Sequence, residues 1–462
     1  MKLVYRIKQS SLILGDFFCF CLSFWLTIAL RYWQTPSFET LFISTSLYVG
    51  LFFCWIVINY INGLYDLSGR IQRGNLYRRI AETAFIILVF SVIYFYFAPN
   101  AEIAPKRILL LNVVIGYALL ALWRMVFDKY IGMQKLRTNV IFVGVTPEAK
   151  NLIDFILVHK QSGYNIVAAI DTTKTMKNKE NGFAIYHDLK SLRPAINTYK
   201  AQLVVIAPHL QRDEDALREL YELLFWSVEI VDATSFYENI TGRIPPATFS
   251  ESWFLEHIHT KVNPLYEKWR TILDYVAGAI MGVVFITLGA LIAGIIRLTS
   301  PGPIFILQKR VGLNGNIFTL YKFRSMYALS ADGSAEVSGV EFAQKEDKRI
   351  TPVGKFLRKT RLDELPQCIN LLKRDVTLIG PRPERPEIVE ELTMRMPFYP
   401  LRHVVRPGLT GWAVLHQNYT DTIEKSLEKL QYDLYYIKNR SFLLDISILL
   451  RTVNIVLRLM GQ

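Results

Sequence analysis

The sequence predicts a membrane protein of mixed class, membrane α + α/β. It would contain a four-helix transmembrane bundle, a Rossmann-like parallel-sheet domain, and an α+β domain with a re-entrant membrane helix and interfacial helices. Three observations lead to this fold class. Hydrophobic residues make up 51% of the 462 residues, which is high for a purely soluble protein. Long apolar runs fill the N-terminal part of the chain, and short apolar strands alternate with helical patterns in its middle part.

Residues 1–132 are predicted to form the transmembrane bundle. Each of its four apolar runs is near the roughly 20 residues that cross a ~30 Å hydrocarbon core: 10–30, 41–61, 83–98 and 108–123. Basic residues gather before the first run, between the second and third, and after the fourth, so the positive-inside rule places both ends of the bundle in the cytoplasm. Asp16 lies inside the first run. We expect it to face the bundle or a partner, most simply through a hydrogen bond to a neighbouring helix, because a carboxylate facing lipid is costly.

Residues 137–250 are predicted to form the Rossmann-like domain, because apolar strands alternate with helices as in a parallel sheet. The first turn of such a domain usually carries glycines that let the backbone approach a pyrophosphate. Here Gly144 is followed by a valine, a threonine and a proline, so the dinucleotide fingerprint is missing. Asp171 follows the second strand, where a ribose-binding acid would stand. Without the glycine loop we expect a scaffold or regulatory role and assign no cofactor-binding residue.

A polar linker at 251–264 leads to the last domain, residues 265–462, which begins with an apolar run at 272–296. The run is long enough to cross a membrane, but basic residues flank it on both sides, so both of its ends should be cytoplasmic. A re-entrant helix satisfies this bias. No proline interrupts the run, so we expect a bend near Thr287 and Gly289, with the threonine hydroxyl bonded to a carbonyl one turn earlier.

The remainder of the last domain is predicted to be α+β. A Ser-Pro-Gly-Pro turn at 300–303 precedes a β-hairpin over 304–326, whose Asn314-Gly315 pair is typical of a two-residue turn. The apolar stretch 441–460 carries one polar stripe, formed by Ser447, Arg451, Asn454 and Arg458. We interpret this stretch as a helix that lies in the membrane interface or packs on the domain, and not as a membrane span.

The net charge of +13 suits an anionic membrane surface or an anionic ligand. No nucleic acid is expected as a partner, because no helix-turn-helix, zinc-finger or RNA-binding signature accompanies the charge. The four cysteines show neither metal-ligand spacing nor a disulfide framework: Cys19, Cys21, Cys54 and Cys368. They indicate a reducing, cytoplasm-facing chain.

One adjacent acid pair, Asp363 and Glu364, lies among six basic residues: Lys355, Arg358, Lys359, Arg361, Arg382 and Arg385. The cations are expected to keep a carboxylate ionised and to collect an anionic substrate around it. A charged helix on a solvated face would also explain the pair. It does not explain the rigid turn from Gly380 to Pro383, which presents an arginine where the chain is not helical. The pattern therefore favours a phosphate or nucleotide site.

The last domain contains five ordered motifs: QKRVG (308–312), YKFRSM (321–326), LDELPQ (362–367), IGPRP (379–383) and VRPGLTGW (405–412). Together they resemble the bacterial polyprenyl-phosphate hexose-1-phosphate transferases, which begin surface-polysaccharide assembly. The bundle and sheet domain ahead of them look like the long form of that family, the initiating undecaprenyl-phosphate sugar phosphotransferases. The resemblance implies that Asp363 is the nucleophile, that Glu364 is a metal or phosphate partner, and that Mg²⁺ is the cofactor, held by these two carboxylates. In one departure, Ile286 and Thr287 stand where the family usually has a Ser-Pro break.

The resemblance also implies a reaction and a location. A UDP-hexose would give hexose-1-phosphate to undecaprenyl phosphate, with UMP leaving and a covalent intermediate on Asp363. The residues expected to bind the anionic substrates are Gln308, Arg310, Lys322, Arg324, Arg358, Arg382 and Arg406. The expected location is the bacterial inner (cytoplasmic) membrane, as a multi-pass protein in the lipid bilayer with cytoplasmic Rossmann-like and catalytic domains. A membrane bundle joined to a scaffold domain favours a homodimer.

The sequence leaves two alternatives to sugar-phosphate transfer. A membrane-anchored nucleotide-sugar 4,6-dehydratase would need an intact glycine loop before a Tyr-x-x-x-Lys pair. The one such pair, Tyr186 and Lys190, follows the altered Gly144 loop. A non-enzymatic membrane nucleotide sensor would leave the acid pair and the turn at 380–383 without a purpose. Transfer of a sugar phosphate explains both features.

Overall fold

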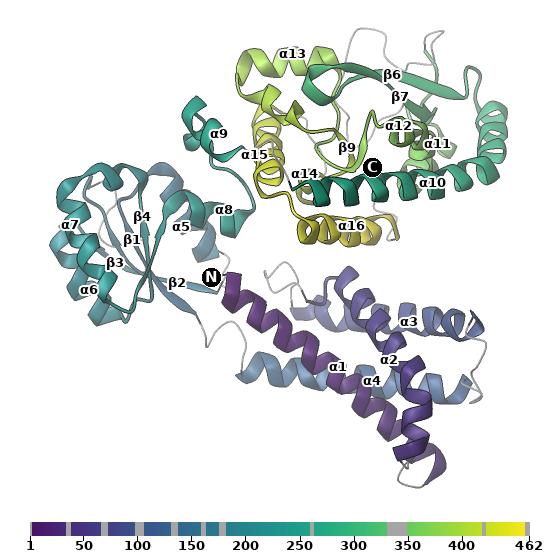
Figure 1. Ribbon diagram of the computed structural model, residues 1–462, viewed down its shortest axis with the longest axis horizontal. Helices are drawn as coiled ribbons and strands as arrows, with labels where there is room; N and C mark the ends of the chain where they lie inside the picture. The colour runs from purple at the N-terminus through teal and green to yellow at the C-terminus, as the bar shows by residue number, and fades with distance from the viewer. Residues whose placement is uncertain are drawn as a thin grey trace. The chain divides into compact units, whose positions relative to one another are not determined.

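The computed structural model describes residues 2–33, 38–65, 73–97, 106–130, 137–158, 163–174, 182–258, 263–329, 349–417 and 422–457. The chain forms two compact units, Met1–Ile240 and Thr241–Gln462. In their described parts, the first unit contains a helical bundle and a parallel-sheet domain, and the second contains helices with short strand pairs (Figure 1). The structure agrees with the predicted class, membrane α + α/β. The boundary between the units lies before residue 250, where the sequence analysis ended the Rossmann-like domain.

Four helices form the bundle: α1 (Lys2–Tyr32), α2 (Phe38–Ile61), α3 (Arg73–Phe97) and α4 (Lys106–Tyr130). They coincide with the four predicted apolar runs. Among the described residues, four segments are long and apolar enough to cross a membrane; three belong to the bundle, Gln9–Arg31, Leu76–Tyr96 and Ile108–Phe127, and the fourth is Pro264–Thr299 of the second unit. The segment Tyr48–Ile61 of α2 is a shorter apolar helix. Aromatic rings fill the interior, where Phe20 meets Trp55 edge-on with 5.0 Å between ring centroids. Such close packing holds helices together in lipid, where the hydrophobic effect between helices is lost.

The carboxylate of Asp16 faces the interior of the bundle, as predicted. Arg124 Nη2 on α4 donates a hydrogen bond to Asp16 Oδ2 on α1 at 2.7 Å, and both side chains are almost fully buried. The ring of Tyr65 lies 5.2 Å from the Arg124 guanidinium. The pair neutralises both charges inside an apolar bundle and ties α1 to α4, so a structural role accounts for the residue.

The other part of the first unit is a five-stranded parallel sheet in the order β3-β2-β1-β4-β5. Its strands are β1 (Thr138–Val143), β2 (Tyr164–Ile170), β3 (Ala184–Tyr186), β4 (Leu203–Ile206) and β5 (Glu229–Asp232). Its helices are α5 (Pro147–Val158), α6 (Leu192–Tyr199), α7 (Glu214–Glu222) and α8 (Ala233–Thr241). Alternate residues of β1 enter two apolar layers, with Ile141 packing toward α6 and α7 and Phe142 toward α5 and α8. Helices on both faces of a parallel sheet confirm the predicted Rossmann-like architecture.

The turn after β1 is Gly144, with a φ of 82°. It lies at the switch point between β1 and β4, where open α/β sheets usually bind ligands. Here a Cβ added to Gly144 would meet Ala207 Cβ at 2.7 Å and Leu210 Cδ1 at 2.8 Å. Helix α5 has Glu148 in its first turn, and a carboxylate there disfavours a bound anion. The carboxylate of Asp171 accepts hydrogen bonds from the backbone and hydroxyl of the threonine two residues later. These contacts favour a scaffold role over dinucleotide binding.

The second unit is an α+β domain. Its described helices are α9 (Glu251–His257), α10 (Pro264–Thr299), α11 (Pro352–Thr360), α12 (Cys368–Lys373), α13 (Pro386–Arg395), α14 (Trp412–His416), α15 (Ile423–Asn439) and α16 (Phe442–Leu457). Its described 3₁₀ helices are η4 (Pro246–Thr248), η5 (Leu313–Gly315), η6 (Leu362–Gln367) and η7 (Tyr399–Val404). The strands are β6 (Phe305–Val311) and β7 (Ile317–Phe323), which pair in antiparallel fashion, and β8 (Thr377–Ile379) and β9 (Gly408–Thr410), which pair in parallel.

The hairpin of β6 and β7 agrees with the prediction, but its connection is longer. Val311 pairs with Ile317, so residues 312–316 form the connection. Asn314 and Gly315 lie within it, with φ values of 54° and 82°. The positive φ values explain the choice of asparagine and glycine, and the two-residue turn expected from this pair is wrong.

Helix α10 is continuous over 36 residues. The backbone stays helical through Thr287 and Gly289, where the sequence analysis expected a bend. Thr287 Oγ1 donates to Val283 O at 3.0 Å, which is the hydrogen bond predicted for this hydroxyl. The ribbon of α10 changes direction along its length without losing its helical form (Figure 1).

Both halves of α10 pack on the same domain. Ala277 shares an apolar cluster with Leu371 of α12, and Ile296 shares one with Leu365 of η6. In a straight helix, Ala277 and Ile296 would stand about 28 Å apart along the axis. Their partners belong to neighbouring elements, because α12 follows η6 directly. Both halves of α10 are therefore held on one domain, and the re-entrant course of this helix in a membrane stays a prediction.

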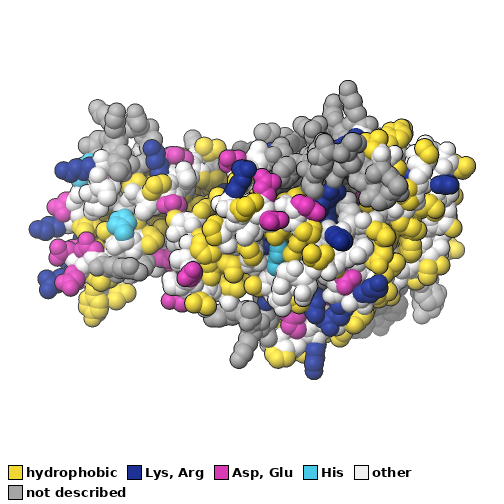
Figure 2. Space-filling model, turned by 90° about the horizontal axis from the view of Figure 1, so that it is seen from above, with side chains coloured by type: hydrophobic (Ala, Val, Ile, Leu, Met, Phe, Trp, Pro, Cys, Tyr) yellow, Lys and Arg dark blue, Asp and Glu magenta, His cyan; other side chains and the backbone are white. Residues whose placement is uncertain are grey.

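Apolar side chains of α10 and α16 remain exposed on the second unit. Ile286 of α10 is 79% exposed and Leu443 of α16 is 70% exposed. Ile448 of α16 is fully buried in the domain core, so this helix packs on the domain, which is one of its two predicted placements. Arg458, the last residue of the predicted polar stripe, lies outside the described residues. Figure 2, which views the molecule from above, shows Lys and Arg side chains beside hydrophobic ones in its right-hand part.

Candidate active site

Asp363 and Glu364 lie in η6, directly after α11. Arg361 ends α11 in the left-handed conformation, with a φ of 60°, and its backbone N–H donates to Arg358 O at 3.2 Å. Leu365 is buried in a cluster with residues of α10 and anchors the next turn. The two carboxylates are thereby held inside the domain, where Asp363 is 7% exposed and Glu364 is 9% exposed.

The carboxylate of Glu364 is held by three cations. Its Oε1 lies 2.8 Å from Arg382 Nη2, 3.2 Å from Lys322 Nζ and 3.6 Å from Arg361 Nη1. Burial alone would raise the pKa of Glu364, but these charges together hold it well below its usual range. Glu364 therefore stays ionised, as the sequence analysis expected, and keeps the three cations in place.

The carboxylate of Asp363 is in a different state. Within the described residues its Oδ1 has no hydrogen-bond partner. Burial and then the neighbouring charge of Glu364 raise the pKa of Asp363 to about 6, against the opposing charges of Lys322 and Arg358. The carboxylate is therefore mostly ionised at neutral pH. Its pKa is nevertheless higher than expected for a carboxylate that has six cations near it in the sequence. A buried, unpaired and ionised oxygen is what an attacking carboxylate needs.

The arginine turn, residues 380–383, carries Arg382 to Glu364. Strands β8 and β9 approach so closely at its start that a Cβ on Gly380 would meet Arg406 O at 2.5 Å. Gly380 N donates to Thr410 O at 2.8 Å, and Gly408 N donates to the carbonyl of the next residue in the turn at 2.9 Å. The backbone of the turn is therefore fixed to β9, and only glycine fits at its first position.

Three buried residues behind the arginine turn were missed by the sequence analysis. Arg402 Nη2 donates to the carbonyl of Arg382 at 2.8 Å and to Asp433 Oδ2 at 2.8 Å, and its Nη1 donates to the hydroxyl of Tyr399 at 2.6 Å. Arg402 is 2% exposed. Its neighbours in the sequence do not mark it as buried, and the partner carboxylate comes from α15 and has no local signature. A second pair, Lys429 and Glu384, supports the end of the same turn.

Lys322, Arg382 and Arg358 are the predicted substrate residues that the structure places at the acid pair. Arg358 Nε donates to Ser325 Oγ at 2.9 Å, and its charge acts on Asp363. Gln308 and Arg310 lie on β6, close to the arginine turn. Arg310 Nη2 donates to Gln308 Oε1 at 2.7 Å, and its Nη1 donates to the carbonyl of Pro383 at 3.1 Å. These two residues support the turn from the side of the hairpin.

Arg324 does not reach the acid pair, contrary to the prediction. Its guanidinium is 1% exposed and donates to the carbonyls of Ser300 and Pro301 and to the hydroxyl of Ser300. It closes the turn that follows α10, because β7 ends at Phe323 and the chain then leaves the strand direction. These contacts give Arg324 a structural role, and its contact with substrate stays a prediction.

Arg406 also lies away from the acid pair. Burial, followed by the charge of Arg374, lowers the pKa of Arg406. The negative charge of Glu267 opposes this shift more than any other charge does. Arg374 donates to the hydroxyl of Thr271 at 3.0 Å, so this group belongs to the first turns of α10. The charges that act most on Arg406 therefore come from Arg374 and the first turns of α10, and not from the acid pair.

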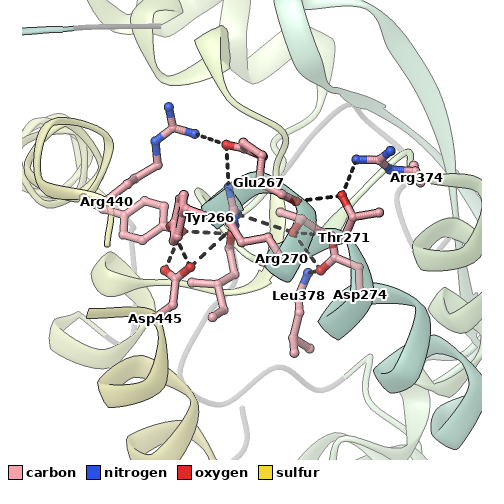
Figure 3. Close-up of polar contacts among 12 residues, drawn as sticks. Tyr266, Glu267, Arg270, Thr271, Asp274, Arg374, Leu378, Arg440 and Asp445 are labelled. Carbon is pink, nitrogen blue, oxygen red and sulfur yellow. Dashed lines mark hydrogen bonds and ion pairs between the residues drawn. The ribbon is translucent and has the colours of Figure 1, made fainter. Parts of the chain in front are cut away.

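The first turns of α10 are tied to β8 and α16 by a polar cluster (Figure 3). Asp274 accepts a hydrogen bond from Leu378 N of β8 at 2.7 Å. Arg270 Nη2 donates to the carbonyl of the last residue of β8, and its Nε lies 3.5 Å from Asp445 Oδ2 of α16. Because β8 leads directly into the arginine turn, the apolar helix and Arg382 share one support.

The two carboxylates could hold a divalent metal only with help from the substrate. Among the described residues, no group of three or more His, Cys, Asp or Glu side chains is placed to hold a metal ion. Mg²⁺ is commonly bound by one or two carboxylates together with substrate phosphates and water. The unpartnered Asp363 Oδ1 and the neighbouring Glu364 fit that kind of site. They would hold the ion in the presence of a nucleoside diphosphate.

Comparison with known proteins identifies the family. The family described as "Bacterial sugar transferase" matches residues 265–459, and the one described as "CoA-binding domain" matches residues 60–230. The UDP-glucose:undecaprenyl-phosphate glucose-1-phosphate transferase of Klebsiella pneumoniae is 30% identical over 346 residues, which are 71% of this chain and 69% of that protein. The chain belongs to the bacterial sugar transferase family. The resemblance drawn from the five motifs is thus confirmed, and the match ahead of residue 265 fits the long form.

Other relatives of this sugar transferase match over shorter segments. The UDP-N-acetylgalactosamine-undecaprenyl-phosphate N-acetylgalactosaminephosphotransferase of Aeromonas hydrophila is 39% identical over 226 residues, 48% of this chain and 50% of that protein. The UDP-glucose:undecaprenyl-phosphate glucose-1-phosphate transferase of Escherichia coli (strain K12) is 42% identical over 164 residues, 35% of this chain and 34% of that protein. The chain thus matches half or less of the length of these two proteins.

Proposed function

We propose that this sugar transferase moves hexose-1-phosphate from a UDP-hexose to undecaprenyl phosphate and releases UMP, as the first membrane step of surface-polysaccharide assembly. The observation that carries the proposal is the buried carboxylate of Asp363, whose Oδ1 has no hydrogen-bond partner within the described residues, beside a Glu364 fixed by three cations. The names of the relatives, which pair UDP-sugars with undecaprenyl phosphate, support the substrates.

The first step is a displacement at the phosphorus that bears the sugar. An oxygen of Asp363 forms a bond to this phosphorus, the bond from the phosphorus to the bridging oxygen of the pyrophosphate breaks, and UMP leaves with that oxygen. No proton is transferred. Lys322, Arg358 and Arg382 surround the acid pair and would offset the negative charge of the attacking and leaving groups.

The second step returns Asp363 to its starting state. A phosphate oxygen of undecaprenyl phosphate attacks the same phosphorus, the bond between the phosphorus and Asp363 breaks, and the lipid diphosphate sugar is released. The exposed apolar face of α10 would keep the lipid chain in the membrane while its phosphate reaches the acid pair. Helix α10 touches η6 through Ile296 and Leu365, so the membrane surface and the acid pair are close neighbours.

Glu364 acts through the cations that it holds. By keeping Arg382 and Lys322 in place, it presents two positive charges beside Asp363 before the substrate arrives. Asp363 and Glu364 would also hold Mg²⁺, which when bound would neutralise charge on the pyrophosphate oxygens.

Glu364→Gln is expected to lower the transfer rate and to raise the Mg²⁺ concentration needed for half-maximal rate, because an amide neither binds the metal nor anchors the cations by charge. The measurement is the initial rate of UMP release as a function of Mg²⁺ concentration. Glu391→Gln, at a surface carboxylate that pairs with Arg395, is the matched control. An unchanged magnesium dependence in the Glu364 variant would remove this residue from the proposed metal site.

The rate of UMP release is expected to rise with pH and to reach half of its maximum near pH 6, because Asp363 attacks only after it has lost its proton and its pKa is raised to about 6. The measurement is a pH profile of the first turnover at UDP-hexose concentrations well below saturation, where the pKa of the free protein governs the rate. A flat profile between about pH 5 and 8 would contradict the assignment of Asp363 as the group that attacks.

The reaction itself is tested with detergent-solubilised protein, radiolabelled UDP-sugars and undecaprenyl phosphate. We expect the label to enter the lipid fraction with one UMP formed for each sugar phosphate transferred. Conversion of the sugar while it stays attached to UDP would instead indicate a dehydratase. Binding of the nucleotide sugar with no turnover would indicate a sensor.

A further inference from the structure

We propose that residues 241–258, which we call the strap, position the arginine turn of the active site and are not a passive linker. The strap precedes the segment that matches the sugar transferase family, which begins at residue 265. It nevertheless belongs to the second unit, which begins at Thr241. Ile244 is fully buried and Phe254 is 6% exposed, both in the core cluster that contains Leu434 of α15. This inference rests on the proposed function, because its test measures the KM of the transfer reaction.

The strap is bound to α15 by polar contacts as well as by burial. Arg243 Nη1 lies 2.8 Å from Glu428 Oε1, and Ile244 N donates to Gln431 O at 3.2 Å. At its other end, Lys438 Nζ lies 5.0 Å from the ring centroid of Trp253. The strap therefore contacts α15 near its start and near its end, which fixes the position of this helix.

The same helix supports the arginine turn from positions next to those contacts. Lys429 pairs with Glu384, and Asp433 pairs with Arg402 at 2.8 Å. Lys429 follows the strap's partner Glu428 directly, and Asp433 is two residues beyond the strap's partner Gln431. A shift of α15 would therefore move both supports of the turn together.

A second route runs through η7. The ring of Phe398 lies 5.0 Å from Phe254 and 6.3 Å from Phe249, both in the strap, by centroid distance. Tyr399 follows Phe398 and accepts a hydrogen bond from Arg402, which in turn donates to the carbonyl of Arg382. The chain of contacts from the strap thus ends on the backbone of the residue that holds Glu364.

The test uses the ion pair of Arg243 and Glu428, whose side chains are 23% and 39% exposed, so that its loss does not open the core. Arg243→Glu places two carboxylates face to face and should displace the strap. We expect the KM for UDP-hexose to rise about fivefold or more with a smaller change in kcat. The reciprocal variant Arg243→Glu/Glu428→Arg should restore the KM. Arg395→Glu, which creates the same repulsion with Glu391 on the surface of α13, should leave it unchanged.

A double-mutant cycle with Arg382→Ala shows whether the strap acts through the turn. If the strap acts through the turn, the double variant has the same KM as Arg382→Ala alone. Two results would overturn the inference. In the first, Arg243→Glu raises the KM by the same factor in the wild-type and Arg382→Ala backgrounds. In the second, Arg243→Glu has the same KM as the surface control Arg395→Glu. Should Arg243→Glu fail to fold, Arg243→Gln takes its place in the same cycle. A wild-type protein that transfers no sugar phosphate would refute the proposed function instead, so the two failures are distinguishable.

Discussion

Asp363→Asn is expected to reduce transfer of the sugar phosphate by roughly 10³-fold or more, because an amide has the shape of a carboxylate but cannot attack phosphorus as an anion. The measurement is the initial rate of UMP release with the purified variant. The matched control is Asp375→Asn, which makes the same change at a carboxylate that accepts a hydrogen bond from Asn370 Nδ2 at 3.0 Å. Transfer by Asp363→Asn within about tenfold of the wild-type rate would refute the assignment of the nucleophile.

The same substitution is expected to stabilise the fold. Burial and the charge of Glu364 raise the pKa of Asp363 to about 6 in the folded protein, above its usual range. A group with a raised folded pKa adds stability below its unfolded pKa, and this contribution is lost as the pH rises through the folded value. At about pH 8 the ionised Asp363 therefore costs roughly 1–3 kcal/mol that asparagine does not. The apparent Tm of Asp363→Asn should exceed that of the wild type at about pH 8, and the difference should vanish below about pH 4.

The second large effect is on stability. Arg402→Met is expected to lower the free energy of unfolding by roughly 3–5 kcal/mol, because it leaves the buried carboxylate of Asp433 without its partner. Burial already raises the pKa of Asp433, and Arg402 is the charge that opposes this rise most strongly. The arginine turn loses its donor to the carbonyl of Arg382 as well, so activity should fall with stability. The measurement is chemical denaturation in detergent, together with the transfer rate.

Two further variants separate stability from activity. Arg402→Met/Asp433→Leu removes both charges and should recover much of the lost stability without recovering the activity. Arg395→Met makes the same substitution in an exposed pair and should change stability by less than about 1 kcal/mol. A loss of similar size for Arg402→Met and Arg395→Met would show that the buried pair does not support the turn.

Much of the first unit could be predicted because its signals are local. Apolar runs define the four helices of the bundle, and the alternation of strands and helices defines the parallel sheet. The place of Asp16 also followed from a single physical rule, since an intramembrane carboxylate needs a partner. What the sequence could not give was the identity of that partner. Arg124 is more than 100 residues away in the chain, and only the packing of α1 on α4 brings it to Asp16.

The site residues that belong to the motifs could be predicted from the sequence. Those whose position depends on tertiary packing could not. Lys322 and Arg324 alternate as if on one strand face, but β7 ends between them, and only Lys322 reaches Glu364. Arg402 was missed because its meaning depends on Asp433, a residue of a distant helix. The strap was read as the end of one domain and a polar linker, since its few apolar residues show no clear period. Their burial depends on a core formed by helices that follow much later in the chain.

The proposed covalent intermediate on Asp363 can be detected in an experiment that leaves out the lipid acceptor. Purified protein is mixed with a UDP-hexose labelled in the sugar, quenched, digested and analysed by mass spectrometry. We expect a burst of one UMP per active chain and the mass of a hexose phosphate on the peptide that contains Asp363, which undecaprenyl phosphate then removes. Release of UMP only when undecaprenyl phosphate is present, with no labelled peptide from a protein that turns over normally, would contradict it.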